Sequence, residues 1–342
     1  MGRPRPHFRV VVKGAVAGAL VAALLGLSVQ GQRATPKPGP PPKLFAFLST
    51  AGGTELDHLR RYGPRISVIA PNWYELNLRA QSLSGGPAPT VVTLTRAAGA
   101  QLWPVVNARL TGGQAIGGTK QRGVIAAAIA TEAARRGYQG MTLDIEQLPA
   151  DYSRAFDALV EAIAARLHAQ QERLAVYVPR RTAHGGDQSY DWPTLLKSAD
   201  LLVVSGYDEH SATSRPGPVT SAAGFEEVLD YGATLSRARV VPAVGAFGYA
   251  WPVGGGPGEF ISTVAADALR TRAGATLRGA GGDTSFVADG LIVHYENTPA
   301  LIARARDARE LGMRWLALFS LGREPDAFWA GITTARQIRD GG

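Results

Sequence analysis

Eight short apolar runs of β-strand character recur along this chain, and longer amphipathic segments separate them. The separating segments are rich in alanine and place apolar residues three and four apart, which predicts helices. Strands that alternate with helices of this length run parallel, and eight such units close into a barrel. The sequence therefore predicts an α/β chain with the (β/α)8 TIM-barrel fold. The predicted strands are LFAFLS (44–49), ISVIAPNWYEL (66–76), QLWPVVNAR (101–109), QGMTLDIE (139–146), RLAVYVPR (173–180), DLLVVSGYDEH (200–210), RVVPAVGAFGYAW (239–251) and WLALFSLG (315–322), and the predicted helices are 55–62, 123–136, 152–170, 225–236 and 299–311.

One segment interrupts the alternation between the seventh and eighth predicted strands. Residues 254–289 are long enough to hold a helix over 259–272, and another apolar run starts at Leu291. We interpret this segment as a small insertion into the barrel. A doubly wound open sheet is the alternative architecture, but no glycine-rich phosphate loop opens any of the predicted helices.

The first 43 residues hold seven basic side chains and no acidic ones. A basic stretch that ends at Lys13 precedes an uncharged run of 16 residues, Gly14 to Val29, which is typical of an export signal or a membrane anchor. We predict a signal peptide or signal anchor over 1–30, a proline-rich linker over 31–43 and a catalytic barrel domain over 44–342. The protein is then exported, and is either secreted or held at the cell surface through the N-terminal segment if that segment is not cleaved.

Beyond residue 43 the chain carries 29 basic and 28 acidic residues, so its net charge of +8 is concentrated at the N-terminus. This balance argues against a nucleic-acid partner. The chain has no cysteine, which excludes thiolate chemistry, cysteine metal ligands and disulfides. We expect a monomer that uses neither a cofactor nor a metal.

The fourth predicted strand places polar side chains on a single face. Because side chains two apart on a strand point the same way, Thr142, Asp144 and Glu146 share one face, and the large apolar residues between them share the other. The apolar face belongs against the outer helices, so both carboxylates point into the barrel at its C-terminal mouth. When two carboxyl groups are enclosed together, the pKa of one of them is raised. We expect Glu146 to be the proton donor and Asp144 to position it and adjust its pKa. The alternative is that the pair only caps a helix or binds a nearby arginine.

The stretch GYQGMTLDIEQL around these acids resembles the signature of glycoside hydrolase family 18, Asp-Gly-x-Asp-x-Asp-x-Glu. It keeps Gly140, Asp144 and Glu146, and it has Gln139 and Thr142 where the family has its first two aspartates.

Three later strands repeat the resemblance in the order that the family has them. Tyr207 and Asp208 match its Met-x-Tyr-Asp strand, with Ser205 in place of methionine. The run 245–251 resembles its Gly-x-Pro-x-Tyr-Gly strand, with alanine at position 246 replacing proline. Phe319 stands where the last strand of the family carries a tryptophan on the barrel floor.

The resemblance implies a retaining glycosidase without a carboxylate nucleophile, because the acetamido group of the sugar attacks its own anomeric carbon. In this chemistry Glu146 is the general acid and base, Asp144 stabilises the acetamido nitrogen and Tyr207 donates to the acetamido oxygen. The substrate is then an N-acetylated polysaccharide such as peptidoglycan, chitin or an exopolysaccharide. We assign further substrate contacts to polar and aromatic residues near strand ends: Thr142, Trp73, Asp208, Tyr249, Trp251, Glu296 and Phe319.

Two other functions remain open at this stage. The departures at Gln139, Thr142, Ser205 and Phe319 fit a catalytically silent barrel that binds glycans. The pairs Asp208-x-His210 and His294-x-Glu296 raise a metal-dependent deacetylase or hydrolase as a third alternative, although no closely spaced set of three ligands accompanies them.

Overall fold

The computed structural model describes residues 39–110, 115–279 and 283–336, all of which belong to the compact unit Lys37–Gly342. The predicted signal or anchor segment and most of the predicted linker lie outside these residues. Within the described ranges, no helix combines the length and the hydropathy needed to cross a bilayer.

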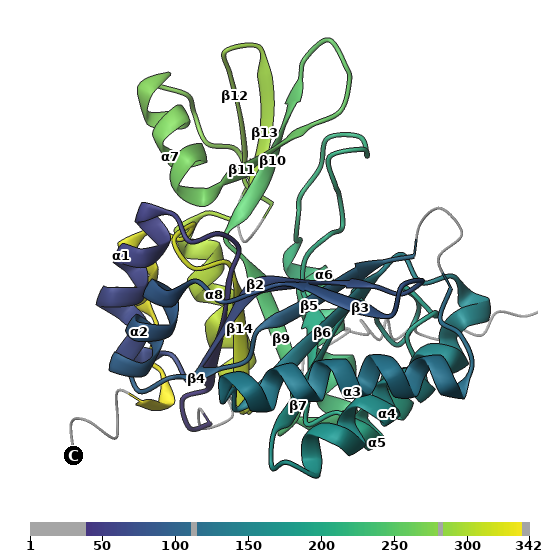
Figure 1. Ribbon diagram of the computed structural model, residues 1–342. Helices are drawn as coiled ribbons and strands as arrows, with labels where there is room; N and C mark the ends of the chain where they lie inside the picture. The colour runs from purple at the N-terminus through teal and green to yellow at the C-terminus, as the bar shows by residue number, and fades with distance from the viewer. Residues whose placement is uncertain (1–38, 111–114, 280–282, 337–342) are drawn as a thin grey trace, which may run out of the picture. The chain divides into compact units, whose positions relative to one another are not determined.

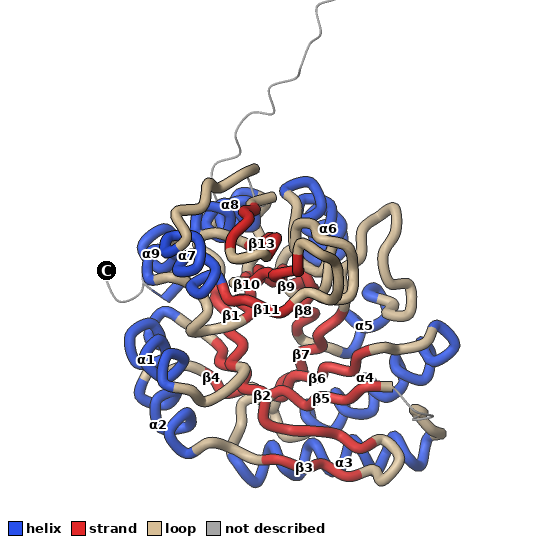
Figure 2. The backbone as a smooth tube through the Cα atoms, turned by 90° about the horizontal axis from the view of Figure 1, so that it is seen from above, coloured by secondary structure: helices blue, strands red, loops and turns tan. Residues whose placement is uncertain are grey.

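Eight parallel strands form a closed barrel, as predicted (Figure 2). Around the barrel their order is β1, β14, β9, β8, β7, β6, β5 and β2, and β2 pairs with β1 to close the ring. β14 therefore lies between β9 and β1. The strands are β1 (Lys43–Leu48), β2 (Val68–Asn77), β5 (Val105–Arg109), β6 (Gly140–Glu146), β7 (Arg173–Val178), β8 (Leu201–Ser205), β9 (Val240–Gly245) and β14 (Trp315–Phe319); short β3 (Ser82–Gly85) and β4 (Gln101–Leu102) add to β2.

Helices surround the barrel (Figure 2). They bury apolar residues against it. In α4 (Ser153–His168), for example, the buried residues Phe156, Val160, Ile163 and Leu167 recur every three or four positions. The five helices predicted around the barrel are all present, whereas the helix predicted over 259–272 begins only at Thr263, because 259–262 form a strand. The other helices around the barrel are α1 (Gly53–Tyr62), α2 (Pro89–Ala97), α3 (Thr119–Arg136), α5 (Trp192–Ser198), α6 (Ala222–Ser236), α8 (Thr298–Glu310) and α9 (Asp326–Gly331), with 3-10 turns η1 (Gly63–Arg65) and η2 (Ala150–Tyr152).

The core has two layers, and β6 shows how the sequence divides between them. Met141, Leu143 and Ile145 are buried in the outer layer, which the helices share. The inner layer fills the barrel with side chains such as Phe45 and Val203. The prediction that the apolar side chains of this strand face the helices is confirmed.

The insertion is a small antiparallel sheet with one helix beyond the C-terminal ends of the barrel strands (Figure 1). The predicted seventh strand, 239–251, is in fact two strands, because the chain leaves the barrel after Gly245 and starts the insertion at Phe247. The insertion is thus wider than the predicted 254–289. It contains β10 (Phe247–Pro252), β11 (Glu259–Ser262), α7 (Thr263–Arg272), β12 (Ser285–Ala288) and β13 (Leu291–Tyr295).

Candidate active site

A cavity of about 350 Å³ opens at the C-terminal mouth of the barrel. Parallel strands end there together, and barrel enzymes carry their active sites at this face. The cavity gathers six of the ten predicted site residues: Asp144, Glu146, Tyr207, Asp208, Tyr249 and Phe319.

Asp144 and Glu146 both line this cavity, as their spacing on β6 predicts, but their environments differ. Oδ1 of Asp144 is buried and has no hydrogen-bond partner among the described residues. Burial raises the pKa of Asp144 to about 8, and the negative charge of Glu146 adds to the rise. Asp144 is the enclosed member of the pair, whereas the Glu146 side chain is 41% exposed.

Two contacts hold this end of β6. The register of β5 against β6 pairs Arg109 with Glu146, and Arg109 Nη2 lies 3.0 Å from Glu146 Oε2. The Tyr190 hydroxyl donates to the Ile145 carbonyl at 2.7 Å, between the two carboxylates. The backbone that carries both acids is therefore fixed from the outer layer, while the Glu146 carboxylate is oriented from the neighbouring strand.

Tyr207 and Asp208 follow the end of β8. Ser205 Oγ donates to the Tyr207 carbonyl at 3.1 Å and to Asp208 Oδ2 at 3.2 Å. Asp208 has a φ of 70°, a left-handed conformation that aspartate tolerates better than most residues. Burial raises the pKa of Asp208 to about 6, against the hydrogen bond from Ser205. The serine that replaces the methionine of the family thus organises this turn.

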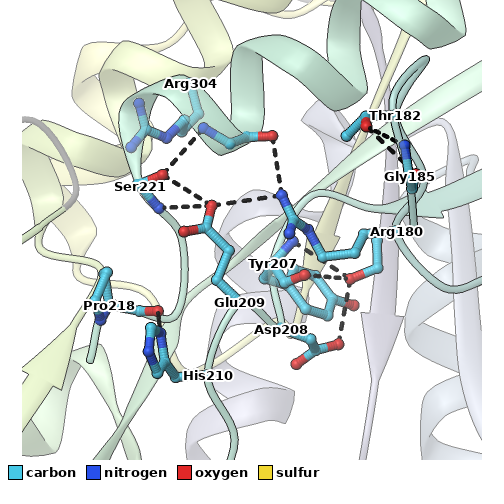
Figure 3. A network of polar contacts seen from close by, with 12 residues as sticks. Arg180, Thr182, Gly185, Tyr207, Asp208, Glu209, His210, Pro218, Ser221 and Arg304 are labelled. Atoms are coloured by element: carbon cyan, nitrogen blue, oxygen red, sulfur yellow. Dashed lines mark hydrogen bonds and ion pairs between the residues drawn. The ribbon is translucent and has the colours of Figure 1, made fainter. Parts of the chain in front are cut away.

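The next residue, Glu209, secures the loop that continues from β8 (Figure 3). Its Oε1 accepts from the Ser221 backbone N–H at 3.0 Å and from the Ser221 hydroxyl at 2.9 Å, and Arg180 Nη2 lies 3.5 Å away. His210 in the same loop contacts the Pro218 carbonyl at 2.9 Å. These contacts fix the chain on the C-terminal side of Tyr207.

Tyr207 is a hydroxyl donor within the cavity. Burial raises the pKa of Tyr207 well above its usual value, so the phenol stays protonated at any physiological pH. The Tyr177 hydroxyl, on the neighbouring β7, lies 3.4 Å from the Tyr207 hydroxyl. The two phenols and the two acids of β6 form the polar side of the cavity.

Aromatic rings form the apolar side. Phe319 lies on the floor, with ring centroids 5.9 Å from Tyr207 and 5.9 Å from Phe247. The insertion supplies a wall in which Phe260, 44% exposed, stacks on Phe247 at 5.0 Å. The Arg323 guanidinium lies 4.4 Å from the centroid of Phe260 and 5.4 Å from that of Phe319. Flat apolar faces opposite hydrogen-bonding groups suit a sugar ring.

Four predicted site residues lie elsewhere. The Thr142 hydroxyl donates to the Trp103 carbonyl at 2.9 Å, inside the barrel below the cavity. Trp73 packs on Tyr138, and the buried Trp251 donates to the Ser214 carbonyl at 3.1 Å. Glu296 is buried beside Arg304. None of the four lines the cavity.

The metal alternative finds no set of ligands: within the described part of the chain no three His, Cys, Asp or Glu side chains gather as a metal site would require. His294 lies 3.9 Å from Asp283.

Several cavity residues were missed. Asn72 of β2 and Asn107 of β5 bond to each other, and Tyr177 is the penultimate residue of β7. Each is a polar residue near the C-terminal end of a predicted strand, and that position alone could have identified them. Phe260 and Arg323 come from the insertion and from the loop after β14, where the sequence carries no comparable indication.

Comparisons with known proteins bear on this arrangement. No protein-family model matches the chain. Over 215 residues it is 23% identical to a Bacillus subtilis protein named "Uncharacterized glycosylase YvbX", covering 59% of this chain and 62% of that one. The chain therefore matches less than two thirds of the length of this curated relative.

Two solved structures share the fold. A chitinase from Chromobacterium violaceum has a TM-score of 0.76 and 25% identity, covering 85% of this chain and 97% of the other. A family 18 chitinase from Cycas revoluta has a TM-score of 0.69 and 16% identity, covering 84% and 97%. The chain is thus similar in sequence to a protein named a glycosylase and shares the fold of family 18 chitinases. Gln139 and Thr142 both bind the backbone: the Gln139 side chain accepts from the Leu102 N–H at 3.0 Å, and Thr142 donates to the Trp103 carbonyl.

Proposed function

We propose that this chain cleaves β-linked N-acetylglucosamine polymers with retention of configuration, by a substrate-assisted mechanism. The observation that carries the proposal is that Asp144, Glu146 and Tyr207 line one aromatic-walled cavity at the C-terminal mouth of the barrel. The likeness to a chitinase at 25% identity over most of the chain supports the N-acetylated substrate.

In the first step, Glu146 donates a proton to the glycosidic oxygen as the acetamido carbonyl oxygen attacks the anomeric carbon. The leaving sugar departs, and the positive charge is held in the ring that the acetamido group has closed. In the second step, Glu146 accepts a proton from water, and this water attacks the anomeric carbon and restores the acetamide. Tyr207 donates to the acetamido oxygen, which places it correctly for the attack.

Asp144 has a distinct role because it is protonated near neutral pH. A neutral carboxyl group has one hydroxyl donor and keeps acceptor capacity. Its hydroxyl is available to the Glu146 carboxylate, and its other oxygen is available to the acetamido N–H. Asp144 therefore fixes the acetamido group and supports Glu146 as the latter changes charge between the two steps.

The N-terminal sequence, with its basic stretch and apolar run, supports an exported enzyme that meets the cell envelope first. We therefore propose an envelope glycan, such as peptidoglycan or an exopolysaccharide, ahead of chitin taken as a nutrient.

The test measures reducing ends released by the full chain from peptidoglycan, chitin oligomers, partly acetylated glucosamine polymer and fully deacetylated polymer, with and without a chelator. We expect cleavage of acetylated substrates only, no effect of the chelator, and about a 10³-fold loss of kcat in Glu146→Gln. Glu161→Gln is the matched control, because Glu161 is an exposed carboxylate on α4.

Binding of these glycans without hydrolysis, equal in wild type and Glu146→Gln, would contradict the proposal and favour a glycan-binding barrel. Activity that a chelator abolishes would favour the metal-dependent alternative.

A further inference from the structure

A second cavity, of about 710 Å³, opens at the opposite end of the barrel, where the strands begin. It shares no lining residue with the candidate active site. Trp103 closes it toward the barrel interior, where the indole packs edge-on against Phe45 at 6.3 Å and its Nε1 donates to Gln101 at 3.0 Å. This basal cavity is therefore a separate site.

The basal cavity is strongly positive. Five lysine and arginine side chains line it, and among the described residues its lining contains a single carboxylate, Asp200. Asp200 already binds His168 at 2.8 Å and Arg173 at 3.3 Å. Basic and acidic residues nearly balance beyond residue 43, so this excess is local. The other four cations are Lys43, Lys197, Arg239 and Arg336.

The strands themselves aim part of this charge inward. Lys43 lies two residues before Phe45, and Arg239 two before Val241, and both Phe45 and Val241 fill the barrel interior. Alternation along each strand therefore places both cations in the lowest inward-facing layer. Barrel interiors are ordinarily packed with branched apolar side chains, so cations in this layer are a departure.

Helix stability accounts for only part of this charge. His168 ends α4 and Lys197 lies in the last turn of α5, where cations stabilise the helix dipole. Lys43, Arg173 and Arg239 instead stand at the beginnings of strands. The helix dipole therefore does not account for these three cations.

The arginines are held without being neutralised. Arg336 donates to the carbonyls of Ile66 and Ala98 at 2.7 and 2.9 Å, and Arg239 donates to the Leu196 carbonyl at 2.6 Å. These acceptors carry no net charge, so each guanidinium keeps its positive charge and further N–H donors. Lys43 lies over the Trp315 ring at 5.2 Å, and both Lys43 and Lys197 are exposed.

We propose that the basal cavity binds a linear ligand that carries several phosphate groups. Asp200 alone cannot neutralise the five lysine and arginine side chains of the basal cavity, whereas a chain of phosphate groups supplies several negative charges. Its oxygens also match the donor geometry of arginine. Arg239 and Arg336, which are fixed by backbone carbonyls, set the position of the ligand, and the exposed Lys43 and Lys197 pair with its phosphate groups.

Isothermal titration of the full chain with tripolyphosphate tests the proposal. We expect one ligand per chain and an affinity that falls as NaCl rises from 50 to 200 mM. The double variant Lys43→Gln/Lys197→Gln should weaken binding about tenfold. Lys120→Gln/Arg154→Gln is the control, because both residues are exposed, lie outside the cavity and remove the same charge; it should stay within about twofold. Circular dichroism verifies that each variant folds.

Two further ligands test the chemistry. Glycerol phosphate represents a lipid headgroup with one phosphate, and polyglutamate represents a carboxylate chain. We expect both to bind at least about tenfold more weakly than tripolyphosphate. The proposal is overturned if wild type does not bind tripolyphosphate, if the control variant loses as much affinity as the cavity variant, or if either ligand binds as tightly as tripolyphosphate.

Discussion

The buried carboxyl group of Asp144 makes folding stability depend on pH in a defined direction. Its pKa is about 8 in the folded chain and 3.8 as an ordinary aspartate. Between these values the folded state holds a proton that the unfolded state has released, so the free energy of unfolding falls as pH rises. The slope is about 1.4 kcal/mol per pH unit. The loss begins near pH 4 and is complete above pH 8.

Asp144→Asn keeps the size of the side chain and removes this titration. We expect the variant to match wild type at pH 4 and to exceed its free energy of unfolding by about 3 to 5 kcal/mol at pH 8. Urea unfolding of both proteins at pH 4, 5, 6, 7 and 8 measures the difference. Because Glu146 contributes to the raised pKa, removing its charge narrows the pH range over which stability is lost, and the same comparison in a Glu146→Gln background should give a smaller difference at pH 8.

Asp151→Asn, which changes an exposed carboxylate, is the control and should show no difference that grows with pH. A stability difference between Asp144→Asn and wild type that stays constant from pH 4 to 8, or shrinks as pH rises, would refute the argument. It would mean that Asp144 is ionised in the folded barrel.

Three further predictions concern other contacts. Tyr207→Phe removes the proposed donor to the acetamido oxygen and should lower kcat on chitin oligomers about 10²-fold, with little change in KM; an unchanged kcat would exclude that role. Arg109→Gln removes the ion pair that orients Glu146, and should lower kcat/KM about tenfold without changing the melting temperature. Burial opposes protonation of His58, but its hydrogen bond to Glu324 prevails and raises the pKa of His58. This contact stabilises the fold below pH 6.5 and is lost as pH rises through the folded pKa, so urea unfolding should show His58→Gln destabilised more at pH 5.5 than at pH 9.

The sequence predicts the barrel because its strands are long, apolar and regularly spaced, and it predicts the faces of β6 because alternation leaves no other arrangement. It fails for α2, where the β-branched residues of PTVVTLTRA obscure the helical pattern. It also fails for α5, which has only seven residues.

In the candidate active site, the arrangement of residues within one strand could be predicted, but contacts between strands could not. Each strand reveals which of its own side chains share a face, so Asp144 and Glu146 could be predicted together. The ion pair of Arg109 with Glu146 depends on the register between two strands, which neither strand encodes alone. Trp251 was assigned to the substrate site because it is an aromatic residue near a strand end, but it is buried and donates its hydrogen bond to the Ser214 carbonyl in the loop after β8.

The position of β14 in the barrel also determines when the chain can fold. β14 is the last barrel strand in sequence, and it pairs with both β1 and β9. A chain that emerges N-terminus first therefore exposes two unpaired strand edges until Phe319 is available, and exposed edges promote aggregation. Barrel closure is consequently a step that follows synthesis of β14, and a truncation before Trp315 should yield an aggregating product rather than a smaller stable domain.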